Sequence, residues 1–167
     1  MRHTLRLNTL KAILGESVLA CVAATLCVLL GIPVSAMFIG WIAFFTRGIT
    51  ARDGLINLGC LLIGLAIGIA AGTASELLAP HLGALTITPV ALLITVVVLS
   101  LRGLPVFNNL LSLFLGVVSF FASHLATTLA TFLELSLACA LGVLAGLLAS
   151  RVQRHWGQAK HPDMPMS

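Results

Sequence analysis

Six apolar stretches, separated by short polar connections, dominate the pattern of the chain. A membrane-spanning helix needs about 20 mostly apolar residues to cross a hydrocarbon core of about 30 Å. The pattern therefore predicts an all-α, polytopic membrane protein of about six transmembrane helices, with the second stretch the shortest. The predicted spans are 12–31, 33–45, 55–78, 85–101, 104–122 and 129–150.

The two halves of this pattern resemble each other. Gly-Ile-Pro at 31–33 is followed by Gly-Leu-Pro at 103–105, and Ala138 of the last span falls where the third has a glycine. Each copy, 12–79 and 84–152, holds three spans, so the second would enter the membrane from the opposite side as an inverted repeat. Chance alignment of common membrane residues is the alternative. The recurring Phe-x-Gly and Phe-Phe modules are Phe38, Gly40, Phe44 and Phe45, then Phe114, Gly116, Phe120 and Phe121; the glycine ladders are Gly64, Gly68 and Gly72, then Gly142 and Gly146.

Composition agrees with a membrane protein. Hydrophobic residues make up 59% of the chain and charged residues 8%, against roughly 25% charged in soluble domains. We expect one membrane domain over 1–152 and a disordered cytoplasmic tail over 153–167. The four cysteines lack metal-site spacing, and we predict neither a metal nor another cofactor.

The basic residues predict the orientation. If the N-terminus lies inside, all nine Lys and Arg fall in cytoplasmic segments, and the outer loops carry none. Both termini are then cytoplasmic. The net charge of +4 is scattered rather than gathered on one face, so we expect no nucleic-acid partner.

Several side chains are candidates for a solute pathway. The six module phenylalanines either form a hydrophobic constriction, with Phe45 facing Phe121, or pack as ordinary aromatics. Glu134 lies inside the last span, where it either contacts a cation or proton or extends to the interface. Asn57, Asn108 and Asn109 either bind a polar solute or cap helices. The glycine ladders favour close helix crossings.

The Phe38–Phe45 stretch with its glycine-rich third span, and the later Phe114–Phe121 module with Gly142 and Gly146, are similar to small bacterial inner-membrane proteins of the DUF1097 family. The resemblance covers about 14–152. It implies a polytopic membrane protein and transfers no catalytic or ligand-binding residue.

No set of nucleophile, base and orienting residue is visible, so we expect no enzyme. The leading hypothesis is a channel or transporter for a small, uncharged or weakly charged solute, with the pathway where the inverted repeats meet. The alternative is a non-transporting scaffold or accessory subunit that packs through its glycine faces. In either case we expect contact with the lipid bilayer and a homo-oligomer, with a trimer as one guess.

Overall fold

The computed structural model describes residues 2–157, with side chains from 9 to 156. This part of the chain folds into six α-helices and two short 3-10 turns, which confirms the all-helical prediction. The helices are α1 (Arg2–Leu30), α2 (Val34–Phe44), α3 (Ala51–Leu82), α4 (Ile87–Ser100), α5 (Leu110–Ser123) and α6 (Leu129–Gly157), with turns η1 (Gly83–Thr86) and η2 (Leu101–Gly103).

Three of the described helical stretches are long and apolar enough to cross a membrane. They are Thr9–Leu30, Ala51–Gly103, which runs through α3 and α4, and Leu129–Trp156. The apolar helices α2 and α5 have only 11 and 14 residues. At 1.5 Å per residue they extend about 16 and 21 Å, well short of a hydrocarbon core of about 30 Å.

The predicted start of the fifth span and the predicted start of the disordered tail were wrong. Residues 104–109 are not helical, and α5 begins six residues later than predicted. Pro105 lacks a backbone donor, and the side chain of Asn109 accepts a hydrogen bond from Ser112 N, so Asn109 caps the helix. At the other end, α6 continues to Gly157, so 153–157 are helical rather than disordered. The rest of the predicted tail lies outside the described residues.

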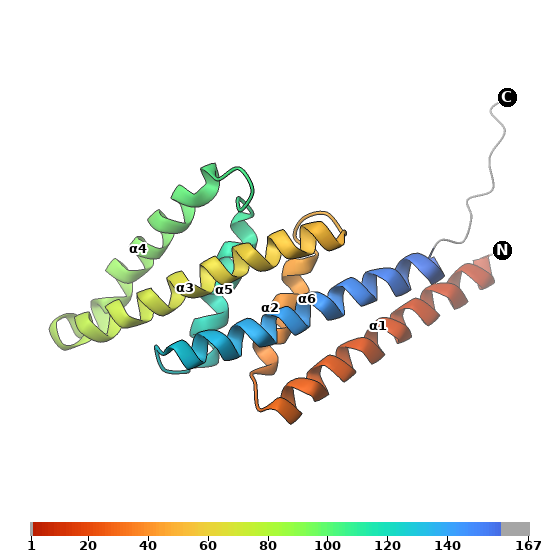
Figure 1. Ribbon diagram of the computed structural model, residues 1–167, viewed down its shortest axis with the longest axis horizontal. Coiled ribbons are helices and arrows are strands. Elements are labelled where there is room, and N and C mark those ends of the chain that lie inside the picture. The colour runs from red at the N-terminus through yellow and green to blue at the C-terminus, as the bar shows by residue number, and fades with distance from the viewer. Residues whose placement is uncertain (1, 158–167) are drawn as a thin grey trace.

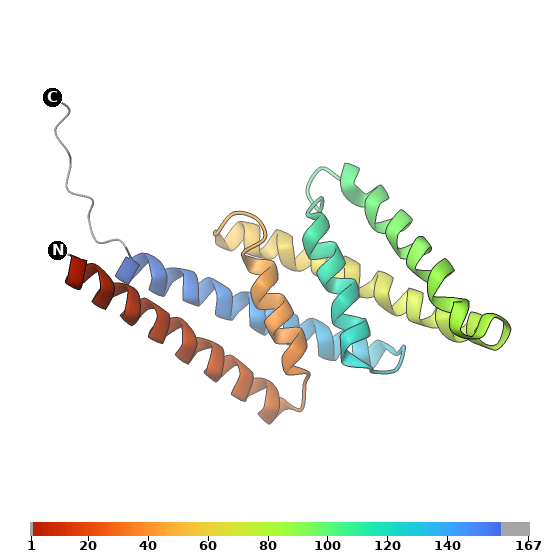
Figure 2. The same cartoon turned by 180° about the vertical axis from the view of Figure 1, so that it is seen from behind.

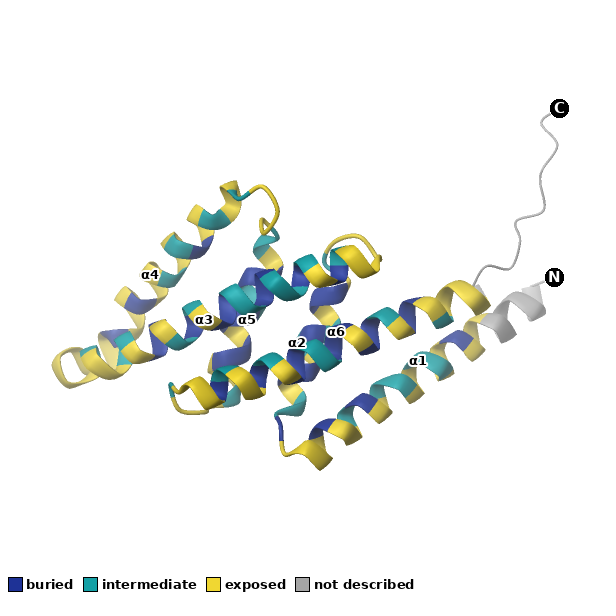
Figure 3. Ribbon diagram, in the orientation of Figure 1, coloured by how far each residue is buried: buried dark blue, intermediate teal, exposed yellow. Residues whose placement is uncertain are grey.

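The long helices α3 and α6 lie side by side, and the short helices α2 and α5 cross them on one side (Figures 1 and 2). Helix α1 runs along α6 at one end of the molecule, and α4 lies beside α3 at the other. Buried residues concentrate on α2, α5 and the facing parts of α3 and α6, whereas α1 and α4 are largely exposed (Figure 3). The core therefore lies where the short helices meet the long ones.

Contacts between connections define two ends of this helical layer. The Arg47 guanidinium donates to Asn108 Oδ1 at 3.0 Å, which joins the α2–α3 loop to the α4–α5 connection. Arg154 of α6 donates to the Ile49 carbonyl of the same loop. At the opposite end, Thr127 donates to the Glu76 carboxylate at 3.2 Å. The chain's described basic connections thus gather at one end.

Candidate functional site at the junction of the short and long helices

Helix α2 packs on α6 at backbone distance, because glycines remove the side chains between them. A Cβ at Gly40 would overlap the carbonyl of Cys139, and a Cβ at Gly142 would overlap the carbonyl of Met37. Close approach of this kind lets helices associate where lipid offers no hydrophobic gain. The contact fixes α2 against the middle of α6.

Helix α5 packs on α3 in the same manner. A Cβ at Gly116 would overlap the carbonyl of Leu61, and a Cβ at Gly64 would overlap that of Leu113. Gly40 and Gly116 belong to the Phe-x-Gly modules, whose phenylalanines, and not glycines, were predicted as functional residues. Each of these glycines precedes a buried phenylalanine, Phe44 or Phe120, by four residues. This spacing places both on one helix face, and it was the feature of the sequence that could have identified the packing face.

Phe44 and Phe120 fill the spaces beside these contacts. Phe44 is fully buried and lies between Gly54 of α3 and Gly146 of α6. A Cβ added at Gly54 would come within 2.9 Å of the Phe44 ring, and one added at Gly146 within 3.0 Å of Phe44 Cβ. Phe120 is 5% exposed and lies against Gly68 and Gly72 of α3. Both phenylalanines are therefore packing residues that the glycine ladders accommodate.

The glycine contacts alter the expected correspondence between the ladders. Gly64 and Gly142 each meet a carbonyl of a short helix, and Gly68 and Gly146 each meet the Cβ of a buried phenylalanine. The sequence repeat instead aligned Ala138, Gly142 and Gly146 with Gly64, Gly68 and Gly72, which is displaced from the observed correspondence by one helical turn. A ladder that repeats every four residues aligns almost equally well after a shift of four, so sequence alone could not distinguish the two registers.

A polar network ties the end of α2 to the start of α5 and to α3. Asn109 donates to Thr46 Oγ1 at 2.6 Å and to Asn57 Oδ1 at 2.8 Å. Asn57 donates to the carbonyls of Ala43 and Phe44 at 2.9 and 3.3 Å. The Thr46 hydroxyl also lies 2.9 Å from the hydroxyl of Ser112.

The amides of this network have no donor to spare. Both hydrogens of the Asn57 amide go to backbone carbonyls, and both hydrogens of the Asn109 amide go to Thr46 and Asn57. Asn57 and Ser112 are fully buried. The network therefore joins helices, and the structural reading of these asparagines is favoured over solute binding. Thr46 and Ser112 were not predicted as members.

Asn108 lies at the exposed edge of this network. It accepts from Arg47, which also makes the ion pair to Asp53, with 3.7 Å between Nε and Oδ1. Asp53 in turn accepts from Thr50 at 2.6 Å, and Thr50 caps α3. The Arg47 side chain thus holds the α2–α3 loop against the α4–α5 connection.

The outward faces of α2 and α5 carry matching apolar stripes. On α2 the exposed positions are Ser35, Phe38, Ile42 and Phe45; on α5 the stripe is Leu111, Phe114, Val118 and Phe121, of which Phe114 is half-buried. Both stripes have the same spacing, and each ends in an aromatic pair, with ring centroids 5.1 Å apart for Phe44 and Phe45 and 5.2 Å for Phe120 and Phe121.

The expected contact between Phe45 and Phe121 is wrong. Thr46, next to Phe45, bonds to Ser112 at the start of α5, whereas Phe121 lies nine residues further along that helix. Nine residues of α-helix correspond to about 13 Å. The antiparallel arrangement of the short helices therefore puts the two rings at opposite ends of the helix pair.

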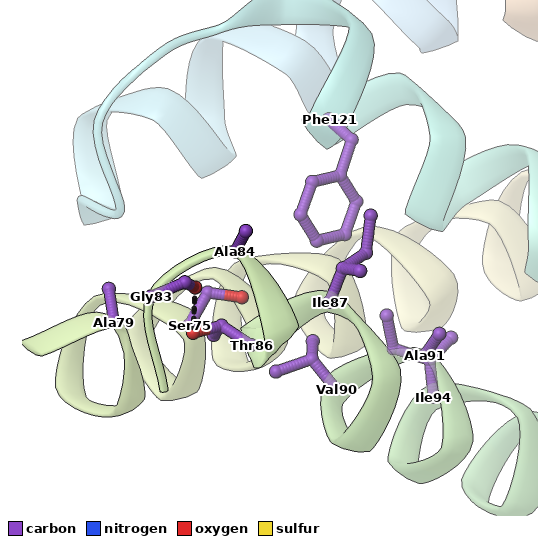
Figure 4. A pocket seen from close by; sticks show the side chains of 10 residues that line it. All are labelled: Ser75, Ala79, Gly83, Ala84, Thr86, Ile87, Val90, Ala91, Ile94 and Phe121. Carbon is purple, nitrogen blue, oxygen red and sulfur yellow. Dashed lines mark hydrogen bonds between the residues drawn. The ribbon is translucent and has the colours of Figure 1, made fainter. Parts of the chain in front are cut away.

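Phe121 instead lines a cavity of about 510 Å³ between α3, η1 and α4 (Figure 4). Its walls are mostly apolar, with the hydroxyl groups of Ser75 and Thr86 as the polar exceptions, and Thr86 donates to the Gly83 carbonyl at 2.7 Å.

Glu134 does not join the site, because it is exposed on α6. Within the described residues, no three His, Cys, Asp or Glu side chains are placed to hold a metal ion.

A family model described as "Protein of unknown function (DUF1097)" matches residues 13–153. The chain belongs to the DUF1097 family. This match confirms the resemblance seen in the sequence and covers all the helices that form the core. No curated protein matches the chain. No solved structure matches it either.

The DUF1097 match and the apolar helices together describe a membrane protein of unknown function. The matched region includes the glycine contacts, the polar network and both exposed stripes.

Proposed function

We propose that this DUF1097 protein transports a small, uncharged or weakly charged solute across the membrane, along the exposed face of α2 and α5. The observation that carries the proposal is that these two helices are too short to cross the hydrocarbon core, yet each leaves one face uncovered. Interrupted backbone at membrane depth is stable only where protein or a water-filled passage covers it.

An internal pseudo-twofold relation supports this assignment. Helix α2 packs on α6 as α5 packs on α3, with glycine against carbonyl at both crossings. The two exposed stripes have equivalent spacing, and the short helices run antiparallel. Inverted three-helix halves of this kind commonly place a solute pathway where they meet. Six spans, with α2 and α5 as the middle member of each half, complete the proposal.

The pathway does not run through the core of one chain. Glycine contacts and the rings of Phe44 and Phe120 fill the space between the short and long helices, and the polar network uses its own amide donors. The outward α2–α5 face is then closed by further copies of the chain. A closed cyclic oligomer, such as a trimer, would surround one passage with several such faces.

The second candidate is a non-transporting scaffold or accessory subunit. It is favoured by the chemistry of the same stripes, which carry no ionisable group and only one hydroxyl, that of Ser35. Such a surface suits helix packing against a partner as well as it suits a dry passage. The two candidates differ in whether solute crosses.

The proposed location is a bacterial inner membrane with both termini in the cytoplasm. The end of the layer that holds Arg47, Arg102 and Arg154 would face inward, because basic connections are retained on the cytoplasmic side. The end that holds Glu76 and Thr127 would face outward.

A flux assay on purified protein in liposomes tests the proposal. Vesicles are challenged with uncharged solutes of increasing size, and their shrinkage and reswelling are followed by light scattering. We expect reswelling faster than in empty vesicles for the smallest solutes, and a changed rate in Phe38→Ala and Phe45→Ala at unchanged melting temperature. Leu77→Ala, a matched exposed site on α3, should leave the rate unchanged. Reswelling equal to that of empty vesicles would reject transport and favour the scaffold.

A further inference from the structure

The cavity beside Phe121 results from a thin contact between α3 and α4. Within α4, which the structure describes completely, only Val90 and Val98 are buried. Ile94 lines both the cavity of about 510 Å³ and a second hollow of about 160 Å³ between the same two helices. Helix α4 therefore contacts α3 along a narrow ridge and leaves space beside it.

The larger cavity is open along its side. Of its ten lining residues only Thr86 and Val90 are buried, and Ile87 is 73% exposed. Because α3 and α4 form one apolar stretch long enough to cross a membrane, this side opening faces hydrocarbon. An empty hollow would forfeit the dispersion contacts of its walls, so hydrocarbon has a reason to enter it. The space itself comes from small residues in the wall, which are Ala79, Gly83, Ala84 and Ala91.

The two ends of the cavity differ in polarity. The hydroxyl groups of Ser75 and Thr86 lie beside Gly83, at the turn that joins α3 to α4 (Figure 4). Thr86 donates to the Gly83 carbonyl, whereas the Ser75 hydroxyl has no hydrogen-bond partner among the described residues. Further along α4 the walls are apolar as far as Ile94, and none of the lining residues is ionisable. The matching ligand is an uncharged hydrocarbon with one polar group at the turn.

We propose that this cavity binds one acyl chain of a membrane phospholipid. The ester group of the chain lies at the Ser75 hydroxyl, and the hydrocarbon follows α4 from Ile87 to Ile94. These seven residues of helix extend about 10 Å, which fits within the hydrocarbon of one leaflet, about half of a core of about 30 Å. Apolar walls with one well-placed polar group are typical of a ligand pocket. Transport is not required for this binding, because no residue of α2 lines the cavity.

The test uses a phosphatidylethanolamine that carries a photoreactive diazirine midway along one acyl chain. The full-length protein in detergent is mixed with an equimolar amount of this lipid, illuminated and digested, and mass spectrometry locates the labelled residues. We expect the label on Val90, Ala91 and Ile94, which line the cavity, to exceed several-fold that on Leu92 and Val96, which are exposed on the opposite face of α4.

A cavity-filling variant provides the comparison. Ala91→Phe should reduce the label on Val90 and Ile94 several-fold, because its ring occupies the space of the chain. Ala66→Phe is the matched control, since Ala66 is an exposed alanine of α3 that does not line the cavity, and it should keep the full label. If Ala91→Phe does not fold, Ala79→Leu fills the same cavity from α3 and must reduce the label in the same way.

The other outcomes each overturn the proposal. Equal label on both faces of α4 would show that lipid coats the helix without a site. Label confined to Leu92 and Val96 would show that the cavity is closed, for example by a second copy of the chain. An equal loss in Ala66→Phe would show that the label does not report this cavity. If hexanol displaces the label as effectively as unlabelled phosphatidylethanolamine, the cavity binds a small neutral solute instead.

Discussion

At the level of single residues, a ladder glycine and a glycine between two spans have different environments. Gly142 of α6 would place a Cβ onto the carbonyl of Met37, whereas Gly103 has open space around it. Sequence spacing predicted that the ladder glycines pack closely, and the described contacts agree. It could not predict which carbonyl each glycine meets, because that depends on the register between helices distant in the chain.

The first prediction concerns these glycines. Gly142→Ala and Gly116→Ala should each lower the free energy of unfolding by about 1–3 kcal/mol, since a methyl group cannot fit against a backbone carbonyl without moving the helix. Thermal melting in detergent measures the effect, with Gly103→Ala as the control that should melt like the parent. A Gly142→Ala protein as stable as the parent would show that the α2–α6 crossing is looser than described.

The second prediction concerns the buried amide of Asn57. Its replacement by Leu removes two donors from the carbonyls of Ala43 and Phe44 and leaves an Asn109 hydrogen without an acceptor. Unmet buried hydrogen bonds cost about 1–3 kcal/mol each, so Asn57→Leu should strongly reduce the melting temperature. Asn108→Ala, at the exposed edge, should have a much smaller effect. Equal effects would mean that the Asn57 amide is not buried between the helices as described.

At the level of helices, the sequence predicted the number and order of the elements well. The glycine and proline of residues 31–33 separate α1 from α2, and a positive φ of 54° at Gly83 marks the end of α3. The start of α5 was placed too early because residues 104–107 are mostly apolar and read as membrane helix. Only the Asn109 cap and Pro105 distinguish this connection from the helix, and caps are local signals that apolar periodicity hides.

The third prediction concerns how α2 is held. Phe44 is fully buried and Phe45 is 39% exposed, although the two are neighbours. Phe44→Ala should cost about 3–5 kcal/mol through the cavity it leaves, and Phe45→Ala much less. Chemical unfolding of both variants under the same conditions measures the difference. If Phe45→Ala lost more stability than Phe44→Ala, the face of α2 that carries Phe45 would be the one packed in the core.

At the level of the whole molecule, the sequence predicted a helical membrane protein, but not which helices pack on one another. Each short helix packs on a long helix distant in the chain: α2 on α6, and α5 on α3. The polar network beside these helix crossings joins Thr46, Asn57, Asn109 and Ser112, which are up to 66 positions apart. Apolar spacing carries no information about such long-range partners, and the two hydroxyl residues are unremarkable in sequence.

The last prediction tests the sidedness that follows from these contacts. Arg47 joins the α2–α3 loop to the α4–α5 connection, and Arg154 joins the same loop to the end of α6. Three separate connections must therefore lie on one side of the membrane, whichever side that is. Fusions of a reporter that is active only outside the cytoplasm, placed after Gly48, Gly103 and Ser167, should all be inactive, because basic connections stay inside.

Fusions after His81 and Leu125 complete the design, because Thr127 and Glu76 hold the α5–α6 loop beside the end of α3 at the opposite end. Both should be active. If every fusion gives the opposite reporter activity to the one expected, the relative arrangement of the helices still holds and only the assignment of the cytoplasmic side fails. If the fusion after Gly103 is the one active fusion among the three expected to be inactive, the α3–α4 segment crosses the membrane once rather than twice. Activity at Gly103 together with inactivity at Gly48 is incompatible with the Arg47–Asn108 contact, so this pair of sites decides between a six-span protein and one in which α4 does not return.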